Sequence, residues 1–242
     1  MYLVLGASGS GRRLVVRDLI EGGLTEADRP SVLISTRESP DPADAGLPGL
    51  SRWEPLAGGG IDGVYPQDAS HVFVIVDGTL DPVDQVESFK SWLGDRGRQV
   101  GVVLCVVDCQ LAERHPKLFA WYEACIHFAD IVLLNHREGV SNKWIAEFRA
   151  KFEDRFFPCL FEFVKDGKVK NPALVLAPVV RRMSHVFDEE EWVAVDEDED
   201  EDSMEDGEET EMKQAVDPYL ERRAGGSRFL QLPDIRDFLP RN

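Results

Sequence analysis

The chain has 242 residues, of which 43% are hydrophobic and 9% aromatic, as is typical of a globular protein with one substantial core. Its net charge of −18 comes almost entirely from residues 188–211, which hold sixteen Asp and Glu and no Lys or Arg; removing those sixteen charges leaves −2. This balance excludes a basic surface for nucleic acid or anionic membranes, and with only a short apolar run at the N-terminus we expect no membrane span and a cytoplasmic protein.

Apolar runs of strand length alternate with helical patterns, which is typical of a parallel sheet covered by helices on both faces. Several runs, such as 72–76, are continuously apolar and predict strands buried on both faces. The predicted strands span 2–6, 31–36, 71–77, 100–107, 130–135 and 158–163. We therefore predict an α/β fold, a three-layer sandwich like that of P-loop NTPases with a mostly parallel central sheet.

Helices are predicted between these strands from their apolar spacing and their capping residues. The first covers 12–21 and stops at Gly22-Gly23, the second opens at Asp81-Pro82, and a third lies within 118–129. Ser141 caps a fourth. Residues 37–70 are rich in Pro, Gly and Asp and predict a long loop region.

The regular pattern stops after residue 187, so residues 1–187 are predicted to form the folded domain. Residues 188–215 are too charged to bury a core, and we expect a disordered acidic linker there. Residues 216–242 regain apolar side chains, which predicts an extension able to dock on a protein partner or to fold back across the domain.

A glycine-rich turn follows the first strand and carries the clearest chemical pattern of the chain. Gly6 and Gly11 have the spacing of the phosphate-binding motif G-x-x-x-x-G-K-[ST], whose backbone N–H groups point at phosphate oxygens. Arg12 takes the place of the motif's lysine, and Arg13 that of the hydroxyl that binds Mg²⁺. Positive charge at a helix N-terminus is unfavourable unless an anion is near, which favours a bound phosphate or a carboxylate from elsewhere in the chain.

The same turn admits a second ligand. Gly6 and Gly9 before a helix also fit the turn of dinucleotide-binding dehydrogenases, in which Arg37 after the second strand could meet a 2′-phosphate. The third glycine of that pattern would fall at position 12, which is arginine. Both interpretations stay open at this point.

Polar residues at the ends of two later strands favour the phosphate-binding interpretation. Asp77 ends a buried strand where P-loop proteins place the acidic group that orients Mg²⁺. Asn135, His136 and Glu138 follow another strand with the spacing of the guanine-reading Asn-Lys-x-Asp motif of GTPases, with His136 for the lysine and Glu138 for the aspartate. The longer glutamate side chain moves both acceptor oxygens outward.

Taken in order, the turn, residues 74–82, 106–108 and 129–138, and Asn171-Pro-Ala173 resemble the nucleotide-binding domain of the CobW-like P-loop GTPases, relatives of the nickel-insertion GTPases. That family hydrolyses GTP with Mg²⁺ and serves metal ions such as zinc or cobalt. The resemblance implies that Asp77 serves the metal, that Asn135, His136 and Glu138 face the base, and that the phosphates are held by Gly6, Ala7, Ser8, Gly9, Ser10, Gly11, Arg12 and Arg13.

Each departure from the family's motifs removes a group that binds phosphate, Mg²⁺, the base or a metal ion. The loop lacks its Lys and Thr, the base motif lacks its Lys and Asp, and residues 37–70 lack the Cys-x-Cys-Cys metal-binding motif; the acidic tail stands in place of the family's C-terminal domain. We expect a degenerate CobW-like protein, with no catalytic residue, that binds GTP or another nucleotide with weakened Mg²⁺ and acts through binding or an unknown protein partner. The alternatives are a weak, atypical GTPase linked to metal homeostasis and an NAD(P)-binding dehydrogenase-like protein.

Overall fold

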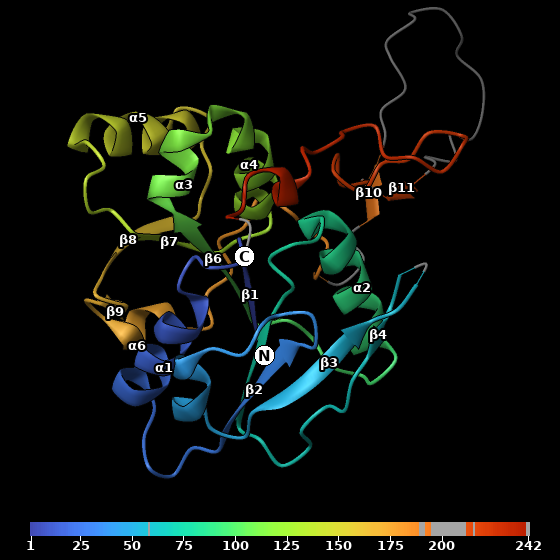
Figure 1. Ribbon diagram of the computed structural model, residues 1–242. Helices are drawn as coiled ribbons and strands as arrows, with labels where there is room; N and C mark the ends of the chain where they lie inside the picture. The colour runs from blue at the N-terminus through green and yellow to red at the C-terminus, as the bar shows by residue number, and fades with distance from the viewer. Residues whose placement is uncertain (58, 189–191, 195–211, 215, 241–242) are drawn as a thin grey trace, which may run out of the picture.

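A computed structural model describes residues 1–57, 59–188, 192–194, 212–214 and 216–240. Within these residues nine strands form one sheet in the order β4-β3-β2-β5-β1-β6-β7-β8-β9, in which the seven central strands are parallel and the two short edge strands are antiparallel (Figure 1). The strands are β1 (Tyr2–Gly6), β2 (Pro30–Ser35), β3 (Ser51–Pro55), β4 (Ile61–Asp62), β5 (His71–Ile75), β6 (Val102–Asp108), β7 (Ile131–Asn135), β8 (Leu160–Lys165) and β9 (Lys168–Val169).

Helices cover both faces of this sheet, so the predicted α/β three-layer sandwich is confirmed. The helices are α1 (Arg12–Gly23), α2 (Pro82–Gly94), α3 (Cys109–Arg114), α4 (Phe119–His127), α5 (Asn142–Glu153) and α6 (Pro172–Val175). Alternation along β1 shows how the faces divide: Leu3 and Leu5 pack under α2, α4 and α5, whereas Tyr2 and Val4 pack under α1 and α6. No described helix is long and apolar enough to cross a membrane.

The strand order distinguishes the two ligand classes that the sequence left open. In this sheet β5 lies between β1 and β2. The dinucleotide-binding order 3-2-1-4-5-6 would instead place the second strand directly beside the first. Arg37, expected to meet a 2′-phosphate, is exposed after β2 and lines the same cavity as Gly9 and Gly11, so its position does not separate the two classes. The topology therefore argues against the NAD(P)-binding alternative.

Residues 37–70 are more ordered than the sequence predicts. They contain a 3-10 helix, η1 (Pro42–Gly46), and the strands β3 and β4, of which β3 extends the parallel sheet beside β2. The prediction of one long loop was therefore wrong. β3 carries a single inward side chain, Trp53, which is 1% exposed, donates from Nε1 to the carbonyl of Ile75 at 3.2 Å and meets Phe89 edge to face.

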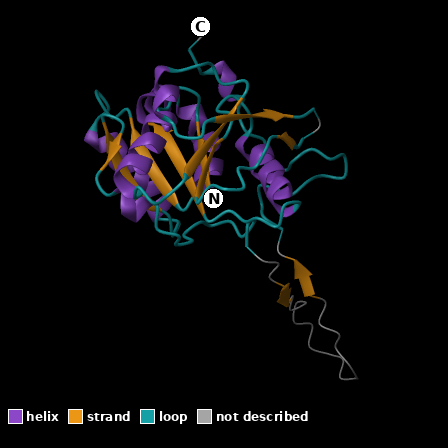
Figure 2. Ribbon diagram, turned by 90° about the horizontal axis from the view of Figure 1, so that it is seen from below, coloured by secondary structure: helices purple, strands orange, loops and turns teal. Residues whose placement is uncertain are grey.

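The C-terminal segment, residues 216–240, folds back across the domain (Figure 1). Ile235 is 1% exposed, and Tyr219, Leu232 and Phe238 pack against the same core cluster as α2 and α4. Arg228 forms ion pairs with two carboxylates of α2, Asp84 and Glu87. Most of the predicted acidic linker lies outside the described residues; at its ends β10 (Trp192–Ala194) and β11 (Met212–Gln214) pair antiparallel, apart from the main sheet (Figure 2).

A buried ion pair fixes the amino end of the sheet, opposite the glycine-rich turn. The Asp130 side chain is fully buried and accepts from the backbone N–H groups of Val103 at 2.7 Å and Arg181 at 2.6 Å. It also pairs with the guanidinium of Arg182 at 3.1 Å, whose side chain is 2% exposed. Removing one member of such a pair leaves the other charged and unpaired inside the protein.

We expect Asp130→Ala to lower the free energy of unfolding by about 3–5 kcal/mol, because it removes the inner partner of buried Arg182 and the acceptor of one buried and one part-buried N–H group. Urea denaturation of the native chain and of Asp130→Ala measures this loss. The matched control is Asp188→Ala, which removes only the outer, half-buried partner of Arg182 and should cost about 1 kcal/mol or less. Equal losses in the two variants would contradict this account.

Candidate functional site

The glycine-rich turn between β1 and α1 is shaped by two close approaches. Gly6 has a φ of +132°, and a Cβ placed on it would lie 2.4 Å from the carbonyl oxygen of Val106 on β6. Gly11 has a φ of +84°, and its Cβ would lie 2.4 Å from Nδ2 of Asn135 at the end of β7. Both positions need glycine for backbone conformation and for space, which accounts for the spacing seen in the sequence.

Several backbone N–H groups of this turn remain available to a ligand. The N–H of Ser8 donates to the carbonyl of Gly78 at 3.0 Å, and that of Ser10 to the carbonyl of Ala7 at 3.1 Å. Among the described residues, the N–H groups of Gly9, Gly11, Arg12 and Arg13 have no protein acceptor. These four residues line a cavity of about 550 Å³, hereafter the loop cavity. The positive end of the α1 dipole adds to their attraction for an anion.

The two arginines of the motif are bound by the protein itself. Arg12 is 4% exposed and donates to the carbonyl of Val76 and to Oε1 of Glu38, each at 2.5 Å. Arg13 is 8% exposed and donates to the carbonyl of Ser39 at 2.8 Å and pairs with Asp44 at 3.0 Å. Their guanidinium groups, which the resemblance assigned to phosphate, are thus already engaged.

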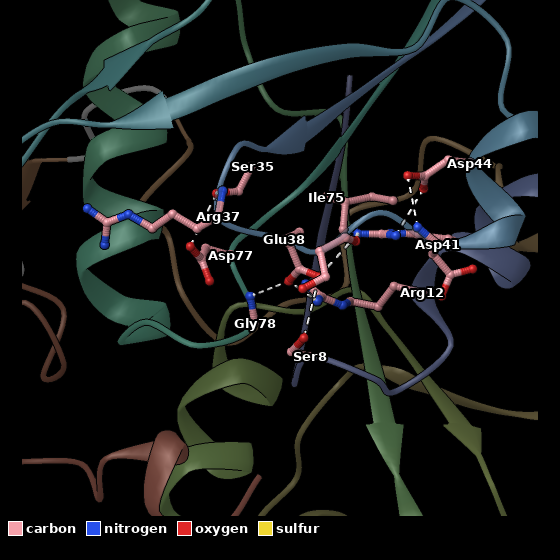
Figure 3. A network of polar contacts seen from close by, with 12 residues as sticks. Ser8, Arg12, Ser35, Arg37, Glu38, Asp41, Asp44, Ile75, Asp77 and Gly78 are labelled. Atoms are coloured by element: carbon pink, nitrogen blue, oxygen red, sulfur yellow. Dashed lines mark hydrogen bonds and ion pairs between the residues drawn. The ribbon is translucent and has the colours of Figure 1, made fainter. Parts of the chain in front are cut away.

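Glu38, just after β2, is the carboxylate that pairs with the positive charges of Arg12 and Arg13 (Figure 3). Besides Arg12 and Arg13 at 2.5 and 3.4 Å, it accepts from the N–H of Gly78 at 2.9 Å and from Oγ of Ser8 at 3.4 Å. Burial alone would raise the pKa of Glu38, but the Arg12 charge and the Gly78 hydrogen bond outweigh burial and hold that pKa below its usual value. Glu38 is therefore ionised at neutral pH.

Asp77, expected to serve Mg²⁺, is fully buried and does not line the loop cavity. Its Oδ1 accepts from the N–H and Oγ1 of Thr79 at 2.9 and 2.6 Å, and its Oδ2 from Oγ of Ser35 at 3.2 Å. No group of three or more His, Cys, Asp or Glu in the described residues is placed to hold a metal ion. With an arginine at the hydroxyl position as well, the residues present do not fit a Mg²⁺ site.

The residues expected at the base divide into two groups. Asn135 is 4% exposed and donates from Nδ2 to the carbonyl of Ser10 at 2.9 Å, so it braces the turn. His136 lines the loop cavity, and its hydrogen bond to Asp108, of 2.9 Å, raises the pKa of its ring. Glu138 is exposed and lines a separate hollow beside α3. The structure thus joins Asn135 and His136 to the turn and leaves Glu138 apart.

Sequence reasoning missed several residues that line the loop cavity, among them Glu38, Leu239 and Pro240. Glu38 follows the second strand directly, and the need of Arg12 and Arg13 for an anion was the signal that could have found it. Leu239 and Pro240 also line the loop cavity, brought there by the C-terminal segment. Their place depends on contacts of this segment with residues more than a hundred positions away, such as Asp84 with Arg228 and His115 with Phe238, which no local pattern reveals.

The chain matches no family model and no curated protein. Among solved structures it is similar to the crystal structure of the Zn(II)-bound YjiA GTPase from E. coli, with 16% sequence identity and a TM-score of 0.43. The similarity covers 79% of this chain, which spans 63% of the length of that one. The site is therefore interpreted from its own geometry.

Replacement of Gly11 tests the close approach of the turn to Asn135. We expect Gly11→Ala to lower the free energy of unfolding by about 2 kcal/mol or more, because it adds a steric clash to the left-handed strain of about 1–2 kcal/mol. Gly9→Ala is the matched control, since Gly9 has a similar φ of +80° and nothing within 4 Å of its Cβ position. The difference between the two in urea denaturation isolates the clash, and equal losses would contradict it.

The ionised state of Glu38 predicts a pH-dependent contribution to stability. In the unfolded chain this carboxyl titrates near 4.5, and in the folded protein its pKa is lower. Ionised Glu38 therefore stabilises the fold fully above about pH 4.5, and this contribution is lost as the pH falls through the folded pKa. We expect the gap in unfolding free energy between the native chain and Glu38→Gln to be largest near neutral pH and to narrow in acid.

Denaturant titrations of both proteins across this range measure that gap. Glu54→Gln serves as the control, because Glu54 is an exposed carboxylate on β3. A gap that stays constant between about pH 7 and pH 3 would show that the Glu38 charge does not stabilise the fold.

Proposed function

We propose that this chain binds a nucleotide through its phosphates in the loop cavity, with little or no GTP hydrolysis, and that it acts through binding or through contact with another protein. The main support is that Gly9, Gly11, Arg12 and Arg13 line this cavity and that their N–H groups have no acceptor in the described residues. Such groups at a helix N-terminus bind phosphate without help from side chains. Binding therefore survives the loss of the motif's lysine.

In this proposal, the loss of the motif's lysine does abolish efficient GTP hydrolysis. Phosphoryl transfer depends on a cation placed at the transferring phosphate and on Mg²⁺ held by the loop hydroxyl. Arg12 is fixed by Glu38 and by the carbonyl of Val76, and it would have to break both contacts to reach a ligand. Losing one preorganised donor typically costs about 3 kcal/mol of transition-state stabilisation, or roughly a hundredfold or more in rate.

The base is left broadly specified. His136 lines the loop cavity, where its ring can stack on a purine, and Asn135 supports the turn rather than the cavity wall. Glu138 lies beside α3, away from the loop cavity, so we do not propose selectivity for guanine. The candidate ligands are accordingly GTP, GDP and ATP.

Charge placed at Gly9 tests this proposal with matched variants. Gly9 lies next to open space, so Gly9→Asp and Gly9→Asn add side chains of the same shape that differ only in charge. We expect a nucleotide at 100 times its Kd to stabilise the native chain by about 2.7 kcal/mol. Gly9→Asn should keep most of that stabilisation, and Gly9→Asp should lose it by charge repulsion.

Thermal unfolding with GTP, GDP, ATP and NADPH, each with and without Mg²⁺, measures the stabilisation, and a phosphate-release assay measures turnover. Equal binding by the Asp and Asn variants would place the phosphates elsewhere. No stabilisation by any nucleotide would overturn the proposal, and rapid phosphate release from GTP would restore the enzymatic alternative.

A further inference from the structure

Glu38 receives donors from three separate parts of the fold. The N–H of Gly78 comes from the segment after β5, Oγ of Ser8 from the turn, and the guanidinium groups of Arg12 and Arg13 from α1. A carboxylate that collects an N–H, a hydroxyl and two guanidinium groups has the partners that bind phosphate oxygens in proteins. The Glu38 side chain is 6% exposed, and the residue lines the loop cavity.

The donors that remain lie beside it in the same cavity. They are the N–H groups of Gly9, Gly11, Arg12 and Arg13, for which the described part of the chain offers no acceptor. Inside the turn, Oγ of the fully buried Ser10 has no partner in the described part of the chain, 3.3 Å from where a Cβ on Gly6 would stand. A buried hydroxyl without a partner is costly unless something else supplies one.

The charges around the cavity limit how much negative charge it accepts. Three arginines, Arg12, Arg13 and Arg52, are paired with two carboxylates, Glu38 and Asp44, so this cluster carries a net charge of +1. Arg37 and Asp41, which also line the cavity, add one charge of each sign and leave that net charge unchanged. A phosphate on the free N–H groups is attracted by that excess and by the helix dipole. A further phosphate next to Glu38 would meet a buried negative charge whose donors are already occupied.

We propose that the Glu38 carboxylate occupies the position that the outermost phosphate of a ligand would otherwise take, and accepts the hydrogen bonds which that phosphate would accept. We call such a carboxylate an internal anion. The loop cavity then takes a phosphate ester through one or two phosphates, without a metal ion, and gains no affinity from a third phosphate. This inference rests on the proposed function, because it specifies the ligand of the same cavity. Glu38 is then a specificity-determining residue. Arg12 supplies the positive charge opposite it, which the motif's lysine and a metal ion would otherwise supply.

Linear phosphates test the inference without reference to a base. Titration calorimetry with orthophosphate, pyrophosphate and tripolyphosphate, each with and without Mg²⁺, compares the native chain with Glu38→Gln. In the native chain the third phosphate and Mg²⁺ should each change affinity by less than about threefold, whereas Glu38→Gln should raise the preference for tripolyphosphate over pyrophosphate by at least about tenfold. Glu38→Ala, which also removes the bulk, should shift the preference in the same direction.

Asp44→Asn is the matched control. It removes the same unit of charge from the same cluster, but Asp44 does not line the cavity and Gly78 does not donate to it, so the preference should change by less than about threefold. Circular dichroism establishes that each variant is folded. An equal shift in the Asp44 and Glu38 variants would reduce the effect to general charge and overturn the inference.

The remaining outcomes separate this inference from the proposed function. If the native chain prefers tripolyphosphate with Mg²⁺ by about tenfold, it binds phosphates but Glu38 is not an internal anion. If only the Glu38 variants bind, Glu38 excludes phosphate from the native cavity, and both the proposed function and the ligand inferred for the native chain are overturned. If neither the native chain nor a folded variant binds any phosphate, both are overturned.

Discussion

The pairing of Glu38 with two buried arginines is the interaction on which the surrounding structure depends. Arg12 and Arg13 stand at the positive end of α1, where burial and the helix dipole both disfavour their charge. A carboxylate must therefore come to them, and the chain after β2 turns toward α1 to supply one. The segment after Glu38 continues into η1, where Asp44 pairs with Arg13 and also with Arg52 on β3. The ion pairs with Arg12 and Arg13 thus hold in place the polar segment from Glu38 through η1, which has few apolar side chains of its own.

The same cluster connects three strand ends. Glu38 follows β2, the N–H of Gly78 follows β5, and Ser8 belongs to the turn after β1; each is bonded to another member of this set. On the opposite side, Asn135 ties the turn to the end of β7. A turn held from both sides keeps its free N–H groups oriented, and such preorganisation lets backbone groups alone hold an anion.

The sequence predicts most of the fold because its signals are local. Continuous apolar runs mark the buried strands, and the caps operate as expected: Asp81 accepts from the N–H of Val83, and Ser141 from that of Trp144. β3 escapes prediction because Ser-Arg-Trp-Glu-Pro has one inward apolar residue and forms a strand by pairing with β2 and β4 rather than through a pattern of its own. Glu38 escapes for a similar reason: its role is created by partners 25, 26 and 40 residues away.

The substitutions in the turn act as a unit rather than as separate losses. The fork of Arg12 reaches Glu38 and the carbonyl of Val76 at once, and a lysine, with a single ammonium group, does not reproduce that planar geometry. A threonine at position 13 would withdraw a counter-charge from both Glu38 and Asp44. Restoring the motif at these two positions alone would therefore leave buried carboxylates short of partners, a cost paid in stability before any catalysis is gained. Arg12, Arg13 and Glu38 are joined by direct ion pairs, so any account of this site must treat the three side chains as one group.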